Sequence, residues 1–303
     1  MRISGAPLRD AALVTGRVSA RDEPGVLCHL GLRGRVEGVV ISVPRLPEHL
    51  LTDQEGALAA MVAAADLAVA DLAGPVDAIG LGSLLAVVAG RGVSLGQQLS
   101  TPVTTGAAAT SWAAVRNTLD WLQGRDEPVV VLGFRSVVGQ AVAAELARQG
   151  VRVIAGGSGK ALERKARRLG VPLLPEDEAA SQARLVLGCA TTGGTLDPAC
   201  LRPGTTLLDV ALPPTLKGPA PHVEVFAAEA VALPEGWTRG FWGRLYHVFS
   251  GYGLGSVYAC LLEPMVMALG GRREPYAQGR AVHLEDFARD AEALGLRPRL
   301  SRH

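Results

Sequence analysis

Hydrophobic and polar residues along the 303-residue chain follow two periods, one typical of strands and one typical of helices. The stretch 35–51 begins with a valine-rich, strand-like run, and the alanine-rich stretch 53–74 that follows it has the pattern of a helix ended by glycine. A second apolar strand is predicted in 76–92 and a second helix in 101–124. Alternating strands and helices predict an N-terminal α/β domain over residues 1–122.

The second half of the chain alternates more regularly. A polar stretch at 123–128 is predicted to be a linker, and helices of about 12 residues then separate short runs rich in β-branched residues. The predicted strands carry the sequences VVVLG, VRVIAGG, VPLL, ARLVLGCA and TTLLDVAL. This order predicts a Rossmann-type, doubly wound parallel sheet over 123–245. Residues 246–303 are expected to form a C-terminal helical segment that packs back on the first domain.

Composition excludes several functional classes. With 48% apolar residues the chain can bury a large core, and a net charge of +1 gives no basic stripe for nucleic acid. The N-terminus lacks the apolar core of a signal peptide, and the alanine-rich stretch is interrupted by Asp66 and Asp71, so we expect a cytoplasmic protein with no integral membrane segment. The four cysteines are far apart and lack zinc-ligand spacing, so no metal site is predicted. They are Cys28, Cys189, Cys200 and Cys260.

A glycine-rich turn follows the first strand of the predicted second domain. Gly133, Ser136 and Gly139 have the G-x-x-G-x-x-G spacing, with an apolar strand before them and an amphipathic helix after them. A dinucleotide pyrophosphate needs such a turn, because backbone N–H groups at a helix start must approach the phosphates closely. The turn therefore predicts a dinucleotide site, and a tight turn without a ligand is the alternative.

The end of the next strand indicates which cofactor is bound. An acidic residue there would bind the ribose of NAD, but the sequence IAGGSGK has no carboxylate. Ser158, Lys160 and Arg164 could instead contact a 2′-phosphate, so NADPH is the predicted cofactor, with a solvated basic helix start as the alternative. The remaining candidate cofactor-binding residues are Arg135, Val138 and Thr191.

Lysine positions exclude a common catalytic route. Several two-domain dehydrogenases, shikimate dehydrogenases among them, use a lysine in the first domain, whereas the lysines here are Lys160, Lys165 and Lys217. A cysteine nucleophile is the remaining option. Cys28 lies in an apolar, strand-like run, where a buried and inert thiol is expected.

The most informative cysteine lies in the sequence SVYACLLEPMVMALGG at 256–271. We predict one helix here, with Ser256 as N-cap and the terminal glycines as its end, so that Cys260 lies near a helix N-terminus, which lowers a thiol pKa. Pro264 would remove the partner of the Cys260 carbonyl and kink this helix. Cys189, at the carboxyl end of a predicted strand, is the rival nucleophile.

Several of these stretches together resemble the long-chain acyl-[acyl-carrier-protein] reductases best known from cyanobacteria. The matching segments are VVISVPRLPEHLL, AIGLGSLLAVVAGRG, TPVTTGAAATSWAAV, the glycine turn, LLDVALPP and ACLLEPMVMALGG. The most specific of them is Ala-Cys-x-x-Glu, here Ala259, Cys260 and Glu263, because the cysteine carries the acyl group in that family. The resemblance implies NADPH-dependent reduction of an acyl thioester to a fatty aldehyde, with acyl carrier protein or acyl-CoA as the substrate partner.

Further roles follow from this expected chemistry. Cys260 attacks the thioester carbonyl, His247 is a candidate general acid, and Glu263 either orients the neighbouring loop or bonds a neighbour. The candidate substrate loop, whose threonines are also the expected caps of the following helix, comprises Thr104, Thr105 and Gly106. Two alternatives stay open: a shikimate-dehydrogenase-like NADP oxidoreductase of a small hydroxy compound, and a non-catalytic NADP-binding homologue. The oligomeric state is also open, with a homodimer as one option.

Overall fold

The computed structural model describes residues 2–6, 24–32, 36–43, 45, 47–191, 193–211, 213–234 and 256–302. The chain forms two compact units, unit 1 with Met1–Ala109 and Val231–Arg297, and unit 2 with Thr110–Ala230 and Pro298–His303. The chain passes from one unit to the other inside helix α5 (Ala107–Leu122). The sequence pattern instead placed domain boundaries after residues 122 and 245.

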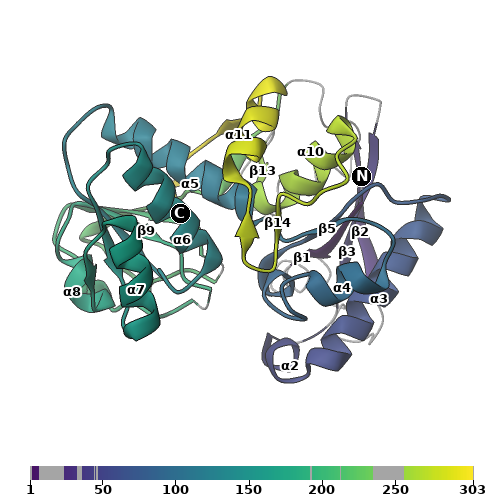
Figure 1. The fold of residues 1–303 in the computed structure, drawn as a ribbon, viewed down its shortest axis with the longest axis horizontal. Helices are drawn as coiled ribbons and strands as arrows, with labels where there is room; N and C mark the ends of the chain where they lie inside the picture. Colours follow the sequence, from purple (N-terminus) through teal and green to yellow (C-terminus); the bar gives the residue numbers. More distant parts are fainter. Residues whose placement is uncertain are drawn as a thin grey trace. The chain divides into compact units, whose positions relative to one another are not determined.

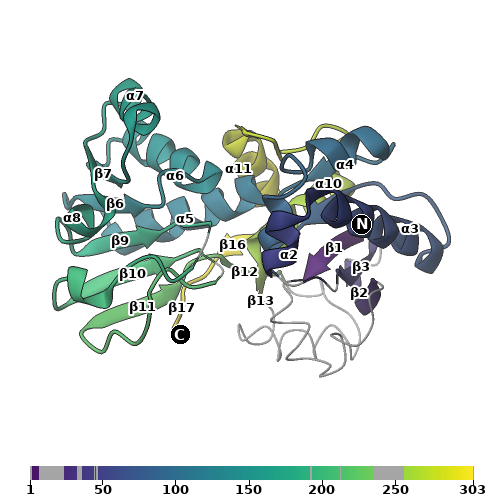
Figure 2. The ribbon, with the colours of Figure 1, turned by 90° about the horizontal axis from the view of Figure 1, so that it is seen from below.

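Unit 1 is built on a five-stranded sheet in the order β2-β3-β1-β4-β5 (Figures 1 and 2). β2 is antiparallel to β3, and the other neighbours are parallel. The strands are β1 (Arg2–Ala6), β2 (Gly25–Leu32), β3 (Val36–Ser42), β4 (Ile79–Leu81) and β5 (Val103–Thr104). The parallel part requires helical crossovers, as the alternating pattern predicted.

The helices of unit 1 follow its strands. Those that lie between β3 and β5 in the sequence are α2 (Pro47–Thr52), α3 (Gln54–Asp71), α4 (Val93–Gln98) and the 3-10 helix η2 (Ser83–Ala86). Helix α3 begins at the cap Asp53, whose carboxylate accepts from the Gly56 N–H at 2.8 Å. It packs on β1 and β3 through a buried stripe of small side chains around Met61, which has no exposed surface. The alanine-rich sequence thus forms a helix that buries one face on the sheet.

Unit 2 contains a seven-stranded sheet in the order β17-β11-β10-β9-β6-β7-β8. Six strands are parallel, and β17 adds antiparallel to β11 at one edge, as Figure 2 shows. Counted from β6, the parallel strands run 3-2-1-4-5-6, which is the order of dinucleotide-binding folds. The strands are β6 (Val129–Leu132), β7 (Val153–Gly156), β8 (Leu173–Leu174), β9 (Leu185–Gly188), β10 (Thr205–Asp209), β11 (Val223–Ala227) and β17 (Ser301–Arg302). The predicted fold class, α/β with a Rossmann-type second domain, is confirmed.

Helices on this sheet bury the apolar stripes expected from the pattern. They are α6 (Val137–Arg148), α7 (Lys160–Leu169), α8 (Glu176–Ala180) and the 3-10 helix η3 (Pro198–Cys200). From α5, Trp112, Val115 and Leu122 are buried, and from α6, Val142 and Leu146 are. Strands β6 and β9 are buried along their whole length, which explains their uninterrupted apolar sequences.

Residues 256–302 differ from the single long helix expected at their start. Ser256–Tyr258 form strand β13, Ala259–Leu261 form the 3-10 helix η4, and only Leu262–Gly270 form α10. The predicted N-cap Ser256 is therefore wrong, while the predicted stop is confirmed, since Gly271 at φ +62° closes α10. The remaining elements are β12 (Ala230–Ala232), β14 (Ala277–Gln278), β15 (Ala281–Val282), α11 (Leu284–Ala293) and β16 (Arg297–Pro298). Helices α10 and α11 pack together within unit 1.

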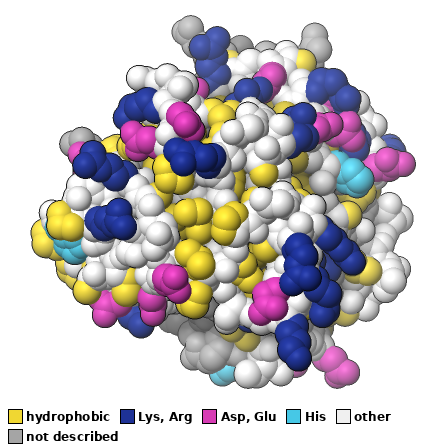
Figure 3. All heavy atoms as spheres, turned by 60° about the vertical axis from the view of Figure 1, so that its left-hand side comes forward, with side chains coloured by type: hydrophobic (Ala, Val, Ile, Leu, Met, Phe, Trp, Pro, Cys, Tyr) yellow, Lys and Arg dark blue, Asp and Glu magenta, His cyan; other side chains and the backbone are white. Residues whose placement is uncertain are grey.

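Surface properties of the described residues agree with the near-zero net charge. Basic and acidic side chains both occur in several places on the face shown in Figure 3. In the described parts of the chain, no helix is both long and apolar enough to cross a membrane. Over the same residues, no group of three or more histidine, cysteine or acidic side chains could hold a metal ion.

Candidate functional site

The glycine turn of unit 2 connects β6 to α6, the first strand and helix of the doubly wound sheet. Gly133 has φ +71°, and a Cβ on it would lie 2.5 Å from the backbone nitrogen of Ala190. A Cβ on Gly139 would lie 2.5 Å from the Gly133 carbonyl oxygen. Both glycines are therefore required, one for the turn against the loop after β9 and one for close packing of α6. Ser136, at the middle position, is the N-cap of α6 and accepts from the Gly139 N–H at 2.8 Å.

Side chains of the helices hold this turn in place. The Gln140 amide donates to the carbonyl oxygens of Phe134 (3.0 Å) and Arg135 (3.2 Å). The Lys165 ammonium donates in turn to the Gln140 amide oxygen. Val138 is half-buried in the first turn of α6. Side chains of α6 and α7 thus hold the turn in this conformation.

A basic cluster borders the turn at the carboxyl end of β7. Arg135 is exposed, and its guanidinium donates to the Ser158 carbonyl oxygen at 3.4 Å. Lys160 and Arg164, both exposed, begin helix α7 directly after this loop. The predicted residues Arg135 and Ser158 are therefore brought together, with the two cations of α7 next to them in the chain.

A carboxylate that the sequence did not indicate also reaches the turn. Glu176, the first residue of α8, accepts from the Gly133 N–H at 3.2 Å and is half-buried. The end of β7, where an acidic residue would bind the ribose of NAD, has none in this sequence. Glu176 instead follows the end of the neighbouring strand β8. Parallel strands end at one edge of the sheet, so an acidic residue after any neighbouring strand was a candidate.

The loop after β9 carries two further predicted residues. Thr191 is exposed there, at the same sheet edge as the glycine turn. Cys189 is only 3% exposed, and burial together with the nearby Asp209 carboxylate raises its thiol pKa far above the ordinary range. Asp209 is held by the Thr215 N–H (2.7 Å) and hydroxyl (2.8 Å). Cys189 is thus a buried, protonated thiol, which makes it a poor nucleophile.

The second candidate centre lies in unit 1 around Cys260. Cys260 is half-buried in the 3-10 helix η4, two residues before α10. Gly106, at φ +76°, lies directly against it, because a Cβ on Gly106 would lie 2.5 Å from the Cys260 Cβ and 2.7 Å from its carbonyl oxygen. The predicted nucleophile and the predicted substrate loop therefore meet.

Glu263 joins this loop to α10 from the inside. Its side chain has no exposed surface, the Thr104 hydroxyl bonds one carboxylate oxygen, and the Ala109 N–H donates to the other at 2.7 Å. Burial raises the pKa of this carboxyl to about 7, against the opposing effect of hydrogen bonds from Thr104 and from backbone N–H groups that include Gly106. Glu263 thus binds the N-terminus of α5, where Thr104 or Thr105 had been expected as the cap. That expectation is wrong.

Pro264 does not kink a helix at Cys260. It is the third residue of α10, where a backbone N–H would have no intrahelical acceptor, so its missing N–H costs nothing. Its ring packs against β4 so closely that a Cβ on Gly80 would lie 2.5 Å from the Pro264 Cγ. The expected kink is wrong because Cys260 lies outside the α-helix.

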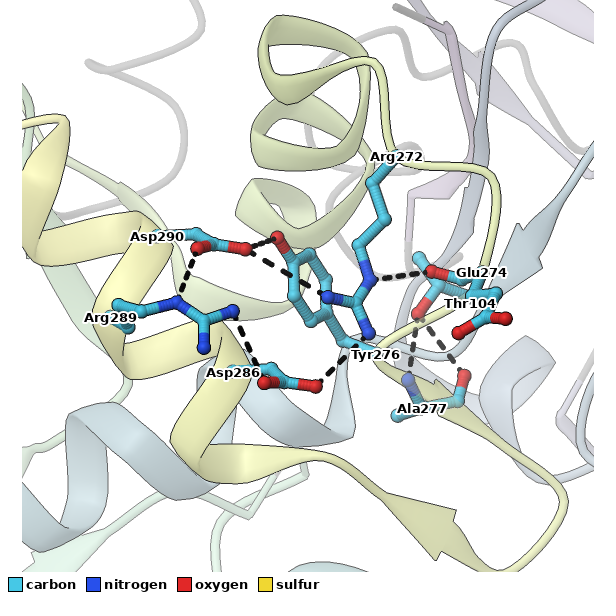
Figure 4. A network of polar contacts seen from close by, with 8 residues as sticks. All are labelled: Thr104, Arg272, Glu274, Tyr276, Ala277, Asp286, Arg289 and Asp290. Carbon is cyan, nitrogen blue, oxygen red and sulfur yellow. Dashed lines mark hydrogen bonds and ion pairs between the residues drawn. The ribbon is translucent and has the colours of Figure 1, made fainter.

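A polar network extends from the candidate substrate loop, here called the threonine loop (Thr104, Thr105 and Gly106), to α11 (Figure 4). The Thr104 hydroxyl donates to the Ala277 carbonyl oxygen at 3.1 Å, as Figure 4 shows. The Thr105 N–H donates to the same carbonyl oxygen at 2.9 Å. Next to Ala277, the Tyr276 hydroxyl donates to Asp290 at 2.6 Å, and the Arg272 guanidinium lies 4.3 Å from the Tyr276 ring centroid. The loop that contacts Cys260 is therefore anchored on two sides, by Glu263 and by the Ala277 backbone.

Other sequence candidates do not join either centre. His247 lies outside the described residues, so its role as a general acid stays a prediction. Cys28 belongs to β2, and the position of its side chain lies outside the described set. Cys200 lies in η3, and its pKa is raised by burial and by Asp177.

Comparisons with known proteins give a curated relative at low identity and several loosely similar structures. No family model matches the chain. An aminotransferase, PigE from Serratia sp. (strain ATCC 39006), is 26% identical over 269 residues, which are 82% of this chain and 30% of the relative. The chain thus spans less than a third of the length of that relative.

Solved structures with related topology include a dehydrogenase and a transhydrogenase. The match with L-tryptophan dehydrogenase from Nostoc punctiforme covers 97% of this chain and 87% of the dehydrogenase chain, at 16% identity and a TM-score of 0.41. The match with transhydrogenase from Sinorhizobium meliloti covers 58% of this chain and 59% of the transhydrogenase chain, at 15% identity and a TM-score of 0.32. TM-scores this low carry no conclusion about activity.

These findings overturn the identification made from sequence. The chain was identified with the long-chain acyl-[acyl-carrier-protein] reductases, but the curated relative described above, PigE, is an aminotransferase. The family identification is wrong, and at 26% identity no other family takes its place. The segments on which it rested are short and apolar, and such segments recur wherever a strand or helix must be buried.

Proposed function

We propose that the chain is a nicotinamide-dependent oxidoreductase. The observation that supports this most is the glycine turn after the first strand of a 3-2-1-4-5-6 parallel sheet. Ligands of such sheets bind outside the carboxyl ends of the strands, where the strand order reverses, and that point lies between β6 and β9. Gly133 and Thr191 follow these two strands.

The residues around this point fit a dinucleotide. The turn from Gly133 to Gly139 would hold the pyrophosphate at the N-terminus of α6, with Ser136 keeping that terminus ordered. Thr191 is exposed and would orient the nicotinamide end. When bound, the nicotinamide supplies or accepts a hydride.

NADPH is the proposed cofactor rather than NADH. Arg135 and the α7 cations Lys160 and Arg164 offer charge-assisted hydrogen bonds to a 2′-phosphate beside Ser158. The Glu176 carboxylate at Gly133 offers an acceptor to a ribose hydroxyl and opposes a phosphate at that point. The three cations favour a 2′-phosphate more strongly than the Glu176 carboxylate opposes it, because that carboxylate already accepts a hydrogen bond from the Gly133 N–H.

A pair of arginine variants tests this cofactor choice. Arg135→Ser should weaken NADPH binding by about tenfold, as expected for the loss of a hydrogen bond to a charged group, and leave NADH binding unchanged. Arg152→Ser is the matched control, because Arg152 is exposed just before β7, at the opposite sheet edge, and pairs with Asp126. Equal effects on the two cofactors, seen by fluorescence titration, would contradict the assignment.

For the substrate, we propose an acyl thioester that is reduced to an aldehyde through Cys260. The Cys260 thiolate attacks the carbonyl carbon, the carrier thiol leaves with a proton, and an acyl group stays bonded to the Cys260 sulfur. Hydride reduction at that carbon, followed by cleavage of the bond to sulfur, yields the aldehyde and the free thiolate. Two observations favour this over oxidation of a small hydroxy compound: Cys260 is half-buried beside the Gly106 loop, and no lysine occurs in unit 1.

The aminotransferase relative fits an aldehyde product. This chain has three lysines, none fully buried, so it offers no enclosed lysine for the Schiff base of a transaminase cofactor. An aldehyde, however, is a carbonyl compound that a transaminase can accept as its amino acceptor. We therefore propose that a transamination consumes the aldehyde made by this chain.

Turnover assays test the substrate class. Purified protein with NADPH and a series of acyl-CoA thioesters of different chain lengths should consume NADPH and form aldehyde with at least one of them, and Cys260→Ser should abolish this while NADPH binding is retained. Cys189→Ser is the matched control and should keep most activity, because that thiol is buried and protonated. Oxidation of a hydroxy compound that resists thiol alkylation would favour the alternative, and full activity of Cys260→Ser would reject the thiol mechanism.

A further inference from the structure

The Thr104 hydroxyl in unit 1 has more acceptors than it has protons. Its oxygen lies within hydrogen-bond distance of a Glu263 carboxylate oxygen and of the Ala277 carbonyl oxygen, the latter at 3.1 Å. It also accepts from the Ala277 N–H at 3.3 Å. A hydroxyl has one proton, so it can donate to Glu263 or to Ala277, but not to both at full strength.

The protonation state of Glu263 decides between these two arrangements. An ionised carboxylate has no proton to give, so Thr104 must donate to it. A neutral carboxyl can donate to the Thr104 oxygen, and the Thr104 proton then turns to the Ala277 carbonyl. Both arrangements satisfy every group, which is why a buried carboxyl is tolerated here in either form.

Cys260 lies on the other side of the same loop. Glu263 accepts from backbone N–H groups that include that of Gly106, and the Gly106 Cα packs against Cys260. Only the backbone of one residue therefore separates the carboxyl from the cysteine. A negative charge at Glu263 opposes a second negative charge on the Cys260 sulfur, and it also offsets the positive end of α5 at Gly106.

We propose that Glu263 and Thr104 are positioning residues that control the ionisation of Cys260, with the carboxylate disfavouring the thiolate and the neutral carboxyl, bonded to Thr104, permitting it. The pair adjusts the thiol without touching substrate. The role of Cys260 in turnover rests on the proposed function, but the control of its ionisation does not.

Other charged groups near this loop keep one charge state around neutral pH. Burial and the Asp290 carboxylate raise the pKa of Tyr276 far above the ordinary value for tyrosine. The Arg272 guanidinium lowers the pKa of Asp286 below the ordinary value for aspartate.

Glu263→Gln separates charge from position. The amide oxygen can still accept from the α5 N–H groups, and the amide N–H can donate to Thr104 as the neutral carboxyl does. The measurement is the alkylation rate of Cys260 by iodoacetamide, followed by peptide mass spectrometry. The Cys200 peptide, from unit 2, is the internal control.

The expected ratio of alkylation rates, Glu263→Gln over wild type, is close to one near about pH 6, where both side chains are neutral. It should rise roughly three- to tenfold near about pH 8, where wild-type Glu263 is ionised and the thiol is still partly protonated. All other side chains are the same in both proteins, so their effects cancel in this ratio. An unchanged ratio for Cys260 across this range would overturn the proposal.

Thr104 variants test the second member of the pair. Thr104→Val removes the hydroxyl that stabilises ionised Glu263, so the Cys260 profile should shift in the same direction as in Glu263→Gln, whereas Thr104→Ser should behave as wild type. Retained NADPH binding and circular dichroism show that each variant is folded. A shifted profile without thioester turnover would support the pair and reject the proposed function, and turnover with an unshifted profile would do the reverse.

Discussion

The buried carboxyl of Glu263 makes a quantitative prediction about stability. Its pKa is raised from 4.5 to about 7 by burial, so the folded protein binds this proton more tightly than the unfolded chain does. The stabilisation is complete below about pH 4.5 and is lost as the pH rises through about 7. The loss corresponds to about 3 kcal/mol of unfolding free energy for the ionised form.

Glu263→Gln removes this titration and keeps the side-chain volume. The difference in unfolding free energy, Glu263→Gln minus wild type, should therefore grow by about 2.5 kcal/mol between about pH 5 and pH 8. Urea denaturation followed by circular dichroism at each pH measures it. All other titrating groups are common to both proteins and cancel.

Glu145→Gln is the control of opposite sign. Glu145, whose side chain is largely buried, pairs with the exposed Arg148 on α6, and this partner lowers the pKa of Glu145. The stabilisation from this pair is therefore complete above the pKa that Glu145 has in the unfolded chain, and it is lost only as the pH falls through the lower pKa of the folded state. Its difference from wild type should stay constant between about pH 6 and pH 8. If Glu263→Gln shows an equally constant difference, then the buried carboxyl does not titrate near neutrality and the reasoning fails.

Three further substitutions probe contacts described above. Gly106→Ala places a Cβ 2.5 Å from that of Cys260 at φ +76°, and should lower the unfolding free energy by about 2–4 kcal/mol in urea denaturation; a loss under about 1 kcal/mol would show that the loop moves freely. Gly133→Ala places a Cβ against backbone after β9 and should abolish NADPH binding in a titration, so unchanged affinity would argue against a dinucleotide at this turn. Tyr276→Phe loses the hydroxyl bond to Asp290 and should cost about 1–3 kcal/mol by thermal denaturation, whereas no cost would mean that water replaces the hydroxyl.

The doubly wound sheet could be predicted because its signals are local. Strands β6 and β9 are buried on both faces, so they appear in sequence as short apolar runs, and each is bounded by glycine or polar residues. The turn at Gly133 and the helix α6 are also encoded by neighbouring residues. A pattern of this kind needs no knowledge of distant contacts.

The centre around Cys260 could be predicted only in part. The sequence brought Cys260 and the threonine loop into one hypothesis, but it predicted the wrong local structure at 256–258. These residues pair with strand β12 as β13, and this pairing outweighs their helical pattern. The binding of α5 by Glu263 joins residues more than 150 positions apart, and no local pattern encodes it. Glu176 was missed for the same reason, since it reaches Gly133 from a different strand end.

Pro264 shows how such distant contacts fix the thiol. Gly80 of β4 and Thr104 of β5 are register partners in the sheet. The consecutive residues Glu263 and Pro264 contact this pair, the carboxylate bonding Thr104 and the proline ring lying on Gly80. Two neighbouring strands thus hold the first turn of α10 at two adjacent points, and the position of Cys260, three residues before Glu263, follows from them. The proline that looked like a disruption of the helix is therefore part of what places the cysteine against the loop.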